Sequence, residues 1–142
     1  MESRHRARLV IADDHTLVAE ACKRLLEPEF DVVAIVNNGR ALVDVGEALR
    51  PEVAIVDIGM PQLNGLDAGE QLKRLVPSIK LVFLTMNLDA EIAAEAFRRG
   101  ASGYIVKNSA ASELMIAIRE ALKGQSYLSP HHRRYCQVFV TG

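Results

Sequence analysis

Long apolar runs are missing from this sequence of 142 residues, and cysteine occurs only twice. The longest apolar runs have the length of a strand, whereas a transmembrane helix needs about 20 apolar residues. The first eight residues are polar and basic without a long apolar stretch behind them, so we expect neither a membrane span nor a signal peptide. Cys22 and Cys136 lack the spacing of metal ligands, and reduced thiols in a cytoplasmic protein are the simplest interpretation.

The chain also lacks an excess of charge of either sign. Lys and Arg together number 17 and Asp and Glu 18, which gives a net charge of -1, and no long run of like charges occurs. Binding to nucleic acid or to a membrane surface usually requires a basic patch or tail. We therefore expect no direct contact between this chain and nucleic acid or a membrane. The length suits one compact domain that folds without disulfides or a structural metal.

Short apolar runs alternate with helical patterns along most of the chain. Apolar residues that recur every three or four positions predict helices, and short apolar runs bounded by polar residues predict buried strands. Strands are expected at 9–12, 32–36, 53–56, 81–84 and 103–106, and helices at 15–26, 40–49, 66–75, 90–99 and 112–122. Five strand–helix units with short connections predict an α/β fold, in which helices cover both faces of a parallel sheet.

The alternating pattern defines one domain with two flanking segments. We expect a disordered N-terminal tail at 1–7, the domain itself at 8–124, and a linker or tail at 125–142. The tail contains the adjacent pair His131 and His132, which could bind a metal but which we expect to be solvated.

Three aspartates follow or end predicted strands. Asp13 and Asp14 come directly after the first strand, and Asp57 ends the third. The carboxyl ends of parallel strands meet at one edge of the sheet, so these carboxylates would repel one another unless a cation lay between them. Oxygen ligands favour Mg²⁺ over a softer metal. Alternatively, an aspartate of the pair only caps the helix that begins near Thr16, although this does not explain all three.

Two further side chains belong to the same predicted edge. A carboxylate beside a metal can act as a nucleophile toward a phosphoryl group, and Asp57 has this position. Thr85 ends the fourth strand and Lys107 follows the fifth, so a hydroxyl and an ammonium group could each bind a phosphoryl oxygen on Asp57. Each residue alone is weak evidence, whereas their joint position is a strong signal.

Together, these motifs resemble the receiver domain of two-component response regulators. The resemblance covers about residues 8 to 124 and depends on Asp13 and Asp14, on Asp57 with Met60, Pro61 and Gly65, on Thr85, and on Tyr104 three residues before Lys107. It implies a flavodoxin-like, doubly wound sheet of five parallel strands in the order 2-1-3-4-5. It also implies a phosphoacceptor that promotes its own phosphorylation and dephosphorylation, and not an enzyme that turns over a separate substrate.

The resemblance also implies roles for the acidic residues. Asp57 would accept a phosphoryl group from the histidine of a sensor kinase. Asp14 and Asp57 would ligate Mg²⁺ together with the Gly59 backbone carbonyl, and Asp13 would reach the ion through water.

The same resemblance assigns the switch. Thr85 and Lys107 would bind the phosphoryl oxygens, and Tyr104 would turn inward as Thr85 moves. Without the family, Tyr104 would be interpreted as an ordinary, partly buried aromatic residue of a strand.

The output of this switch stays open. Residues 127–130 and 103–107 look like those of receivers that precede a helix-turn-helix DNA-binding domain in LuxR-type transcriptional regulators, and no such domain follows in this sequence. The chain is therefore either part of a longer regulator or a stand-alone receiver that acts by protein contact. Leu114, Ile118 and Leu122 of the last helix are expected mainly in the core, and outward residues such as Met115 could contribute to a homodimer.

Two other protein classes fit less well. An aspartate-nucleophile phosphatase of the haloacid-dehalogenase type needs a second aspartate two residues after the nucleophile, where this chain has Gly59. A flavodoxin-like cofactor-binding protein needs a phosphate-binding loop after the first strand, where Asp13 and Asp14 would repel phosphate.

Overall fold

The computed structural model describes residues 5–86 and 89–130. In these residues the predicted element boundaries differ from the observed ones by at most two positions, and α1 begins one residue later than predicted. The strands are β1 (Arg8–Ala12), β2 (Asp31–Val36), β3 (Val53–Asp57), β4 (Lys80–Thr85), β5 (Ala101–Val106) and β6 (Tyr127–Leu128). The helices are α1 (Thr16–Leu26), α2 (Gly39–Leu49), α3 (Gly65–Leu75), α4 (Ala90–Arg98), the 3₁₀ turn η1 (Lys107–Ser109) and α5 (Ala110–Leu122).

The strands form one parallel sheet in the order β2-β1-β3-β4-β5-β6. The predicted parallel α/β fold is therefore confirmed, but the prediction of five strands is incomplete. β6 lies in the segment that we expected to be a linker, and its residues pair with β5 through Gly103 and Tyr127 and through Tyr104 and Leu128. A two-residue strand is too short to produce a period-two pattern, so hydropathy periodicity does not indicate it.

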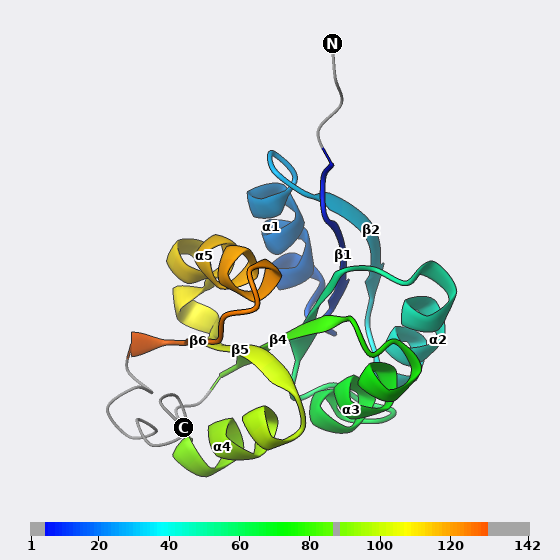
Figure 1. Ribbon diagram of the computed structural model, residues 1–142, viewed down its shortest axis with the longest axis vertical. Coiled ribbons are helices and arrows are strands. Elements are labelled where there is room, and N and C mark those ends of the chain that lie inside the picture. Colours follow the sequence, from blue (N-terminus) through cyan, green and yellow to red (C-terminus); the bar gives the residue numbers. More distant parts are fainter. Residues whose placement is uncertain (1–4, 87–88, 131–142) are drawn as a thin grey trace.

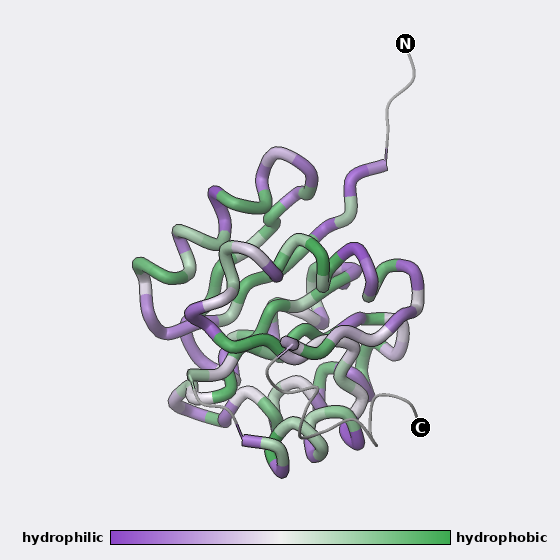
Figure 2. The backbone as a smooth tube through the Cα atoms, turned by 90° about the vertical axis from the view of Figure 1, so that its left-hand side faces the viewer, coloured by the Kyte–Doolittle hydropathy of each residue, from purple (hydrophilic) through white to green (hydrophobic). Residues whose placement is uncertain are grey.

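Helices cover both faces of this sheet, as Figure 1 shows. Buried side chains of α1 and α5 form one core cluster with Leu9, Ile11 and Ile55, and those of α2, α3 and α4 form a second cluster with Val10 and Phe83 on the opposite face. Both clusters include residues of the central strands, which explains why these strands are apolar throughout. In Figure 2 the hydrophobic colour follows the inner strands, and hydrophilic residues gather on the outer loops and helix turns.

Side chains fix the beginnings of three helices. Asn38 accepts a hydrogen bond from Ala41 N at α2, and Asn64 accepts one from Asp67 N at α3. Asp89 accepts hydrogen bonds from two backbone amides at the start of α4. Each cap compensates an amide that has no partner within its helix. The helices therefore start at fixed positions, and the loops that carry the polar residues of the sheet edge have fixed lengths.

The segments that flank the predicted domain contact it. Ala7 is buried, and the Arg6 guanidinium donates to the Phe30 carbonyl oxygen over 2.8 Å, although both belong to the stretch 1–7 that we expected to be disordered. Residues 1–4 of that tail, and the His131–His132 pair, lie outside the described residues.

A buried carboxylate holds β6 against the sheet. Glu113 of α5 accepts hydrogen bonds from the Tyr127 hydroxyl (3.0 Å) and from Ser129 Oγ (2.8 Å). Ser129 Oγ in turn accepts from Val106 N, and Ser129 N donates to the Tyr104 carbonyl oxygen. Side-chain and backbone bonds thus fasten this segment to β5, which carries Tyr104 and precedes Lys107.

We predict that Glu113→Ala lowers the free energy of unfolding by about 2 kcal/mol, because the change removes a buried acceptor from two hydroxyl groups. Urea unfolding measures this loss. The matched control is Glu120→Ala on the same helix, whose carboxylate pairs only loosely with Lys123 (3.6 Å) and which should change stability by less than about 0.5 kcal/mol. Equal effects of the two substitutions would contradict a role for this network.

The Cys22 thiol should be unreactive in the folded protein. Burial and, to a smaller extent, the nearby Asp13 carboxylate raise the pKa of this thiol from 9.0 to about 11, against a smaller lowering by Lys107. The thiolate is the reactive form, so alkylation by iodoacetamide should be slow until urea unfolds the protein. A Cys136→Ser background isolates the signal, and fast alkylation of Cys22 under native conditions would refute the prediction. Because only the unfolded thiol ionises between pH 9 and 11, this group makes stability fall as pH rises through that range.

Candidate functional site

The polar residues predicted for the sheet edge come together at the carboxyl ends of the strands. Asp13 follows β1, Asp57 is the last residue of β3, Thr85 is the last residue of β4, and Lys107 follows β5. The aspartates are 2% and 3% exposed and Thr85 is 7% exposed, so these groups are withdrawn from solvent although each is polar. Parallel pairing of the four strands is what brings the four chain segments to one edge.

Lys107 contacts both buried carboxylates. Its Nζ lies 3.1 Å from Asp13 Oδ2 and 3.2 Å from Asp57 Oδ2, and the lysine side chain is only 6% exposed. Buried charges require such pairing, because removal from water costs several kcal/mol per ion. Lys107 therefore contacts a carboxylate that lies 94 positions earlier in the sequence, on Asp13.

The cluster remains short of positive charge. Asp13, Asp14 and Asp57 supply three carboxylates against the single ammonium group of Lys107, which leaves two negative charges. Asp13 Oδ2 and Asp57 Oδ2 are buried atoms that, in the described part of the chain, accept no hydrogen bond in addition to their ion pairs with Lys107. One divalent cation would compensate this charge, and a set of carboxylate oxygens suits Mg²⁺. The residues present therefore fit the metal that the sequence predicted.

His15 is a member of the cluster that the sequence prediction missed. Its Nδ1 lies 3.0 Å from Asp13 Oδ1, 3.3 Å from Asp14 Oδ1 and 3.8 Å from Asp57 Oδ2. Potential ligand atoms of these four residues all lie within 4.8 Å of one another. We had counted His15 as the first residue of a helix, but α1 begins at Thr16 and His15 is its N-terminal flanking residue. The only sequence signal was its place directly after the aspartate pair.

The alternative role of the aspartate pair, as a helix cap, is not supported. The residue before α1 is His15, and its side chain makes no capping hydrogen bond to the helix. Instead, Asp13 Oδ1 accepts a hydrogen bond from His15 N over 2.8 Å, outside the helix, and Asp14 is exposed to solvent beside the cluster. Asp13 and Asp14 are thus held at the edge by the loop, with one carboxylate buried and the other open to solvent.

The loop after Asp57 is closely constrained. Gly59 N donates to Asp57 Oδ1 over 3.2 Å, and a Cβ atom at Gly65 would lie 2.2 Å from the Asp57 carbonyl oxygen, so α3 can start there only with glycine. Gln62 and Leu63 both adopt left-handed backbone, with φ of 50° and 87°. Such conformations are unfavourable for these residue types and occur where surrounding structure enforces them. The constrained loop thus holds the Asp57 carboxylate through the hydrogen bond from Gly59 N. The Gly59 carbonyl as a metal ligand stays a prediction.

Tyr104 is fully buried on β5, in the core cluster beneath α4 that also contains Phe83, Ala93 and Leu128. It pairs with Phe83 of β4, two residues before the Thr85–Val106 pair. Its burial agrees with an aromatic residue in the core. Its movement as part of a switch stays a prediction.

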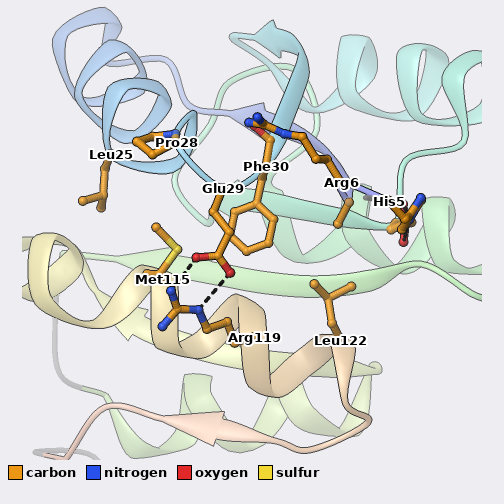
Figure 3. A pocket seen from close by; sticks show the side chains of 11 residues that line it. His5, Arg6, Leu25, Pro28, Glu29, Phe30, Met115, Arg119 and Leu122 are labelled. Atoms are coloured by element: carbon orange, nitrogen blue, oxygen red, sulfur yellow. Dashed lines mark hydrogen bonds and ion pairs between the residues drawn. The ribbon is translucent and has the colours of Figure 1, made fainter. Parts of the chain in front are cut away.

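An open pocket of about 920 Å³ lies at the opposite edge of the sheet. It is lined by residues that precede β1, β2 and β3, by Leu25 of α1 and by residues of α5, as Figure 3 shows. Glu29 and Arg119 form an ion pair across it, and this contact lowers the pKa of the Glu29 carboxyl. The polar residues of the site do not line this pocket.

We predict that Lys107→Ala lowers the melting temperature in the absence of divalent cations and that Mg²⁺ restores much of the loss. Removing one partner of a buried ion pair costs about 3–5 kcal/mol, because an uncompensated charge stays buried, and a bound cation would compensate it. Thermal unfolding with and without MgCl₂ measures both effects. Lys123→Ala, at the exposed end of α5, is the control and should change neither value. A Lys107→Ala protein as stable as the wild type without Mg²⁺ would contradict the charge argument.

The chain is an open, parallel α/β domain with a buried carboxylate cluster and a lysine at the carboxyl edge of its sheet, where such folds bind their ligands. Residues 9–119 match the family model described as "Response regulator receiver domain", and the chain belongs to this family. The match covers both aspartate segments, Thr85 and Lys107, and the family resemblance seen in the sequence is thereby confirmed.

The curated relatives are longer than this chain. The chain is 36% identical to the transcriptional regulatory protein DegU of Brevibacillus brevis over 89% of this chain and 54% of that protein. It is 29% identical to the nitrate/nitrite response regulator protein NarL of Escherichia coli strain K12, over 91% of this chain and 61% of that protein. The chain thus spans little more than half the length of these relatives.

Solved structures agree with the fold. A LuxR-family two-component response regulator from Aurantimonas sp. SI85-9A1 matches with a TM-score of 0.89 and 29% identity, over 94% of this chain and 96% of that one. The isolated receiver domain of RcsB from Salmonella enterica serovar Typhimurium, solved with the phosphomimetic BeF₃⁻, matches with a TM-score of 0.84 and 27% identity, over 92% and 98% of the two chains. Among the residues described here, no helix is long and apolar enough to cross a membrane.

Proposed function

We propose that Asp57 is the phosphoacceptor of this receiver domain and that Mg²⁺ binds beside it. The observation that carries the proposal is the buried Asp57 carboxylate, 3.2 Å from the Lys107 ammonium group at an edge with two uncompensated negative charges. Asp13 and Asp14 are the other carboxylates that would hold the ion, together with the Gly59 carbonyl. When bound, the ion neutralises charge on the carboxylates and on the incoming phosphoryl oxygens.

Asp57, Lys107 and Thr85 have different roles in the proposed phosphoryl transfer. An oxygen of the Asp57 carboxylate attacks phosphorus, the bond from phosphorus to the imidazole nitrogen of the kinase histidine breaks, and an acyl phosphate forms on Asp57. The free imidazole is the leaving group. Lys107 and Thr85 would bind phosphoryl oxygens, since an ammonium group and a hydroxyl supply hydrogen bonds to the charge that develops there. The proposed partner is therefore a sensor histidine kinase.

Phosphorylation would then change the surface around β5. The acyl phosphate adds charge and strong acceptors next to Lys107 and Thr85, which would draw both groups toward it. A shift of β4 and β5 would reach Tyr104 and the surface formed by α4, β5 and α5. Inverting a population ratio of 1:99 requires about 5.5 kcal/mol of differential stabilisation, which a few charge-assisted hydrogen bonds can supply.

We propose a transcriptional output in the full protein, in the cytoplasm. Support comes from the names of the relatives, which include the transcriptional regulatory protein DegU, and from the fact that the chain spans 54% of that protein. The remaining part of such a regulator would contact DNA, because this chain has a net charge of -1 and no basic patch was predicted in it. A stand-alone receiver that acts by protein contact is the second candidate.

A second copy of the chain is a further proposed partner. A solved structure with a TM-score of 0.84 to this chain holds two RcsB dimers on DNA. The residue expected to point outward, Met115, is half-buried against the α1–α5 core cluster, whereas Ile116 is 45% and Leu122 is 37% exposed. Leu114 and Ile118 are fully buried as expected, but Leu122, also expected in the core, is exposed, so Ile116 and Leu122 are the apolar residues that α5 offers to a partner.

Incubation with Mg²⁺ and acetyl phosphate tests the proposed function. We expect the intact mass to rise by one phosphoryl group in the wild type and in Asp44→Ala, and to stay unchanged in Asp57→Ala. Asp44 is an exposed aspartate on α2 and serves as the control. Uptake that persists in Asp57→Ala would overturn the assignment of the phosphoacceptor.

A further inference from the structure

The His15 imidazole is the one nitrogen ligand in a cluster otherwise composed of carboxylates. Its Nδ1 lies 3.0, 3.3 and 3.8 Å from carboxylate oxygens of three different aspartates. Adjacent ligands of an octahedral ion with bonds of about 2.1 Å are separated by about 3 Å. The ring nitrogen and the carboxylate oxygens are thus already spaced like the ligands of one coordination shell.

Two contacts hold the ring in this place. The backbone amide of His15 donates to Asp13 Oδ1, which fixes the residue against the buried carboxylate, and the position before α1 fixes its backbone. The other contact is from Lys107 Nζ, which lies 2.9 Å from Nδ1. The side chain is 57% exposed, so the outer part of the ring lies in solvent while Nδ1 faces the cluster.

Nδ1 is the ring nitrogen that faces the cluster. A lysine ammonium group has only donors and a carboxylate only acceptors, so Nδ1 accepts from Lys107 when the ring proton is on Nε2, and donates to Asp13 Oδ1 when the proton is on Nδ1. A histidine binds a metal through an unprotonated nitrogen, so a bound cation would select the form with the proton on Nε2. A cation that enters the site would take the place of the Lys107 proton at the Nδ1 lone pair.

Resting on the proposed function, we propose that His15 is a ligand of the divalent cation and that it shifts the site's metal preference from Mg²⁺ toward transition metals such as Mn²⁺. Imidazole is a poor ligand for Mg²⁺, which keeps oxygen ligands and water, and a good one for the first-row transition metals. A site with three carboxylates alone would bind both ions through oxygen. The bond from the His15 imidazole nitrogen would strengthen the binding of a transition metal and not that of Mg²⁺.

Pulsed electron paramagnetic resonance of the full chain with one equivalent of Mn²⁺ tests this directly. We expect hyperfine coupling between Mn²⁺ and a nitrogen nucleus in the wild type, and its loss in His15→Phe, which keeps the ring and removes both nitrogens. The matched control is His5→Phe, because His5 contacts Glu52 outside the cluster and should leave the coupling unchanged. His15→Ala repeats the test without an aromatic ring.

Titration of both metals gives an independent result. His15→Phe should weaken Mn²⁺ binding by about tenfold, while Mg²⁺ affinity changes by less than about threefold. Absence of nitrogen coupling in the wild type, its persistence in His15→Phe, or an equal loss of affinity for both metals would overturn the proposal.

The phosphorylation assay separates this inference from the function on which it rests. If Asp57 takes up a phosphoryl group with Mg²⁺ and no Mn²⁺–nitrogen coupling is seen, only the role of His15 is wrong. If the wild type binds neither metal and takes up no phosphoryl group, the proposed function fails, and the inference fails with it.

Discussion

The burial of two carboxylates from different strands at one edge of a parallel sheet is the constraint on which this structure depends. Asp13 and Asp57 are almost inaccessible to solvent, and at close range in a medium of low dielectric constant their charges repel strongly. Lys107 compensates part of this charge and divides its ammonium group between them. The remaining negative charge favours binding of a divalent cation at this edge. The Lys107 ammonium group is already buried, so its desolvation would not add to the cost of binding a phosphoryl group.

Parallel topology produces this arrangement from distant segments. The β1, β3, β4 and β5 strands all end at the same edge, so a polar residue placed at each strand end joins the site whatever its distance in sequence. Helices on both faces keep the strands dry, which raises the strength of each electrostatic contact at the edge. Gly65 is required where α3 begins, because a side chain there would collide with the Asp57 carbonyl oxygen. The fold therefore fixes the Asp57 carboxylate through backbone contacts as well as through its ion pair.

Hydropathy periodicity was sufficient to predict the five long strands, the five helices and the edge at which Asp13, Asp57, Thr85 and Lys107 meet, since long periodic elements carry strong local signals. Two features escaped it. β6 is too short for any period and depends on Glu113, whose partners Tyr127 and Ser129 are distant in sequence. His15 was assigned to the helix by its neighbours, because no local rule states which way a residue at a helix start points. Both features depend on contacts between elements.

The two missed features lie at the two ends of one chain of contacts. His15 Nδ1 contacts Lys107, Lys107 follows β5, and β5 pairs with β6 through Tyr104, whose carbonyl oxygen accepts from Ser129 N. Val106, the residue before Lys107, donates its amide to Ser129 Oγ. Lys107 directly follows β5, and β5 holds β6 and Ser129. A change in the contacts of Lys107 therefore acts on the strand that holds this last segment. The proposed phosphorylation at Asp57 would thereby have a direct physical route to the segment that follows β6, in addition to any change on the surface of α4 and α5.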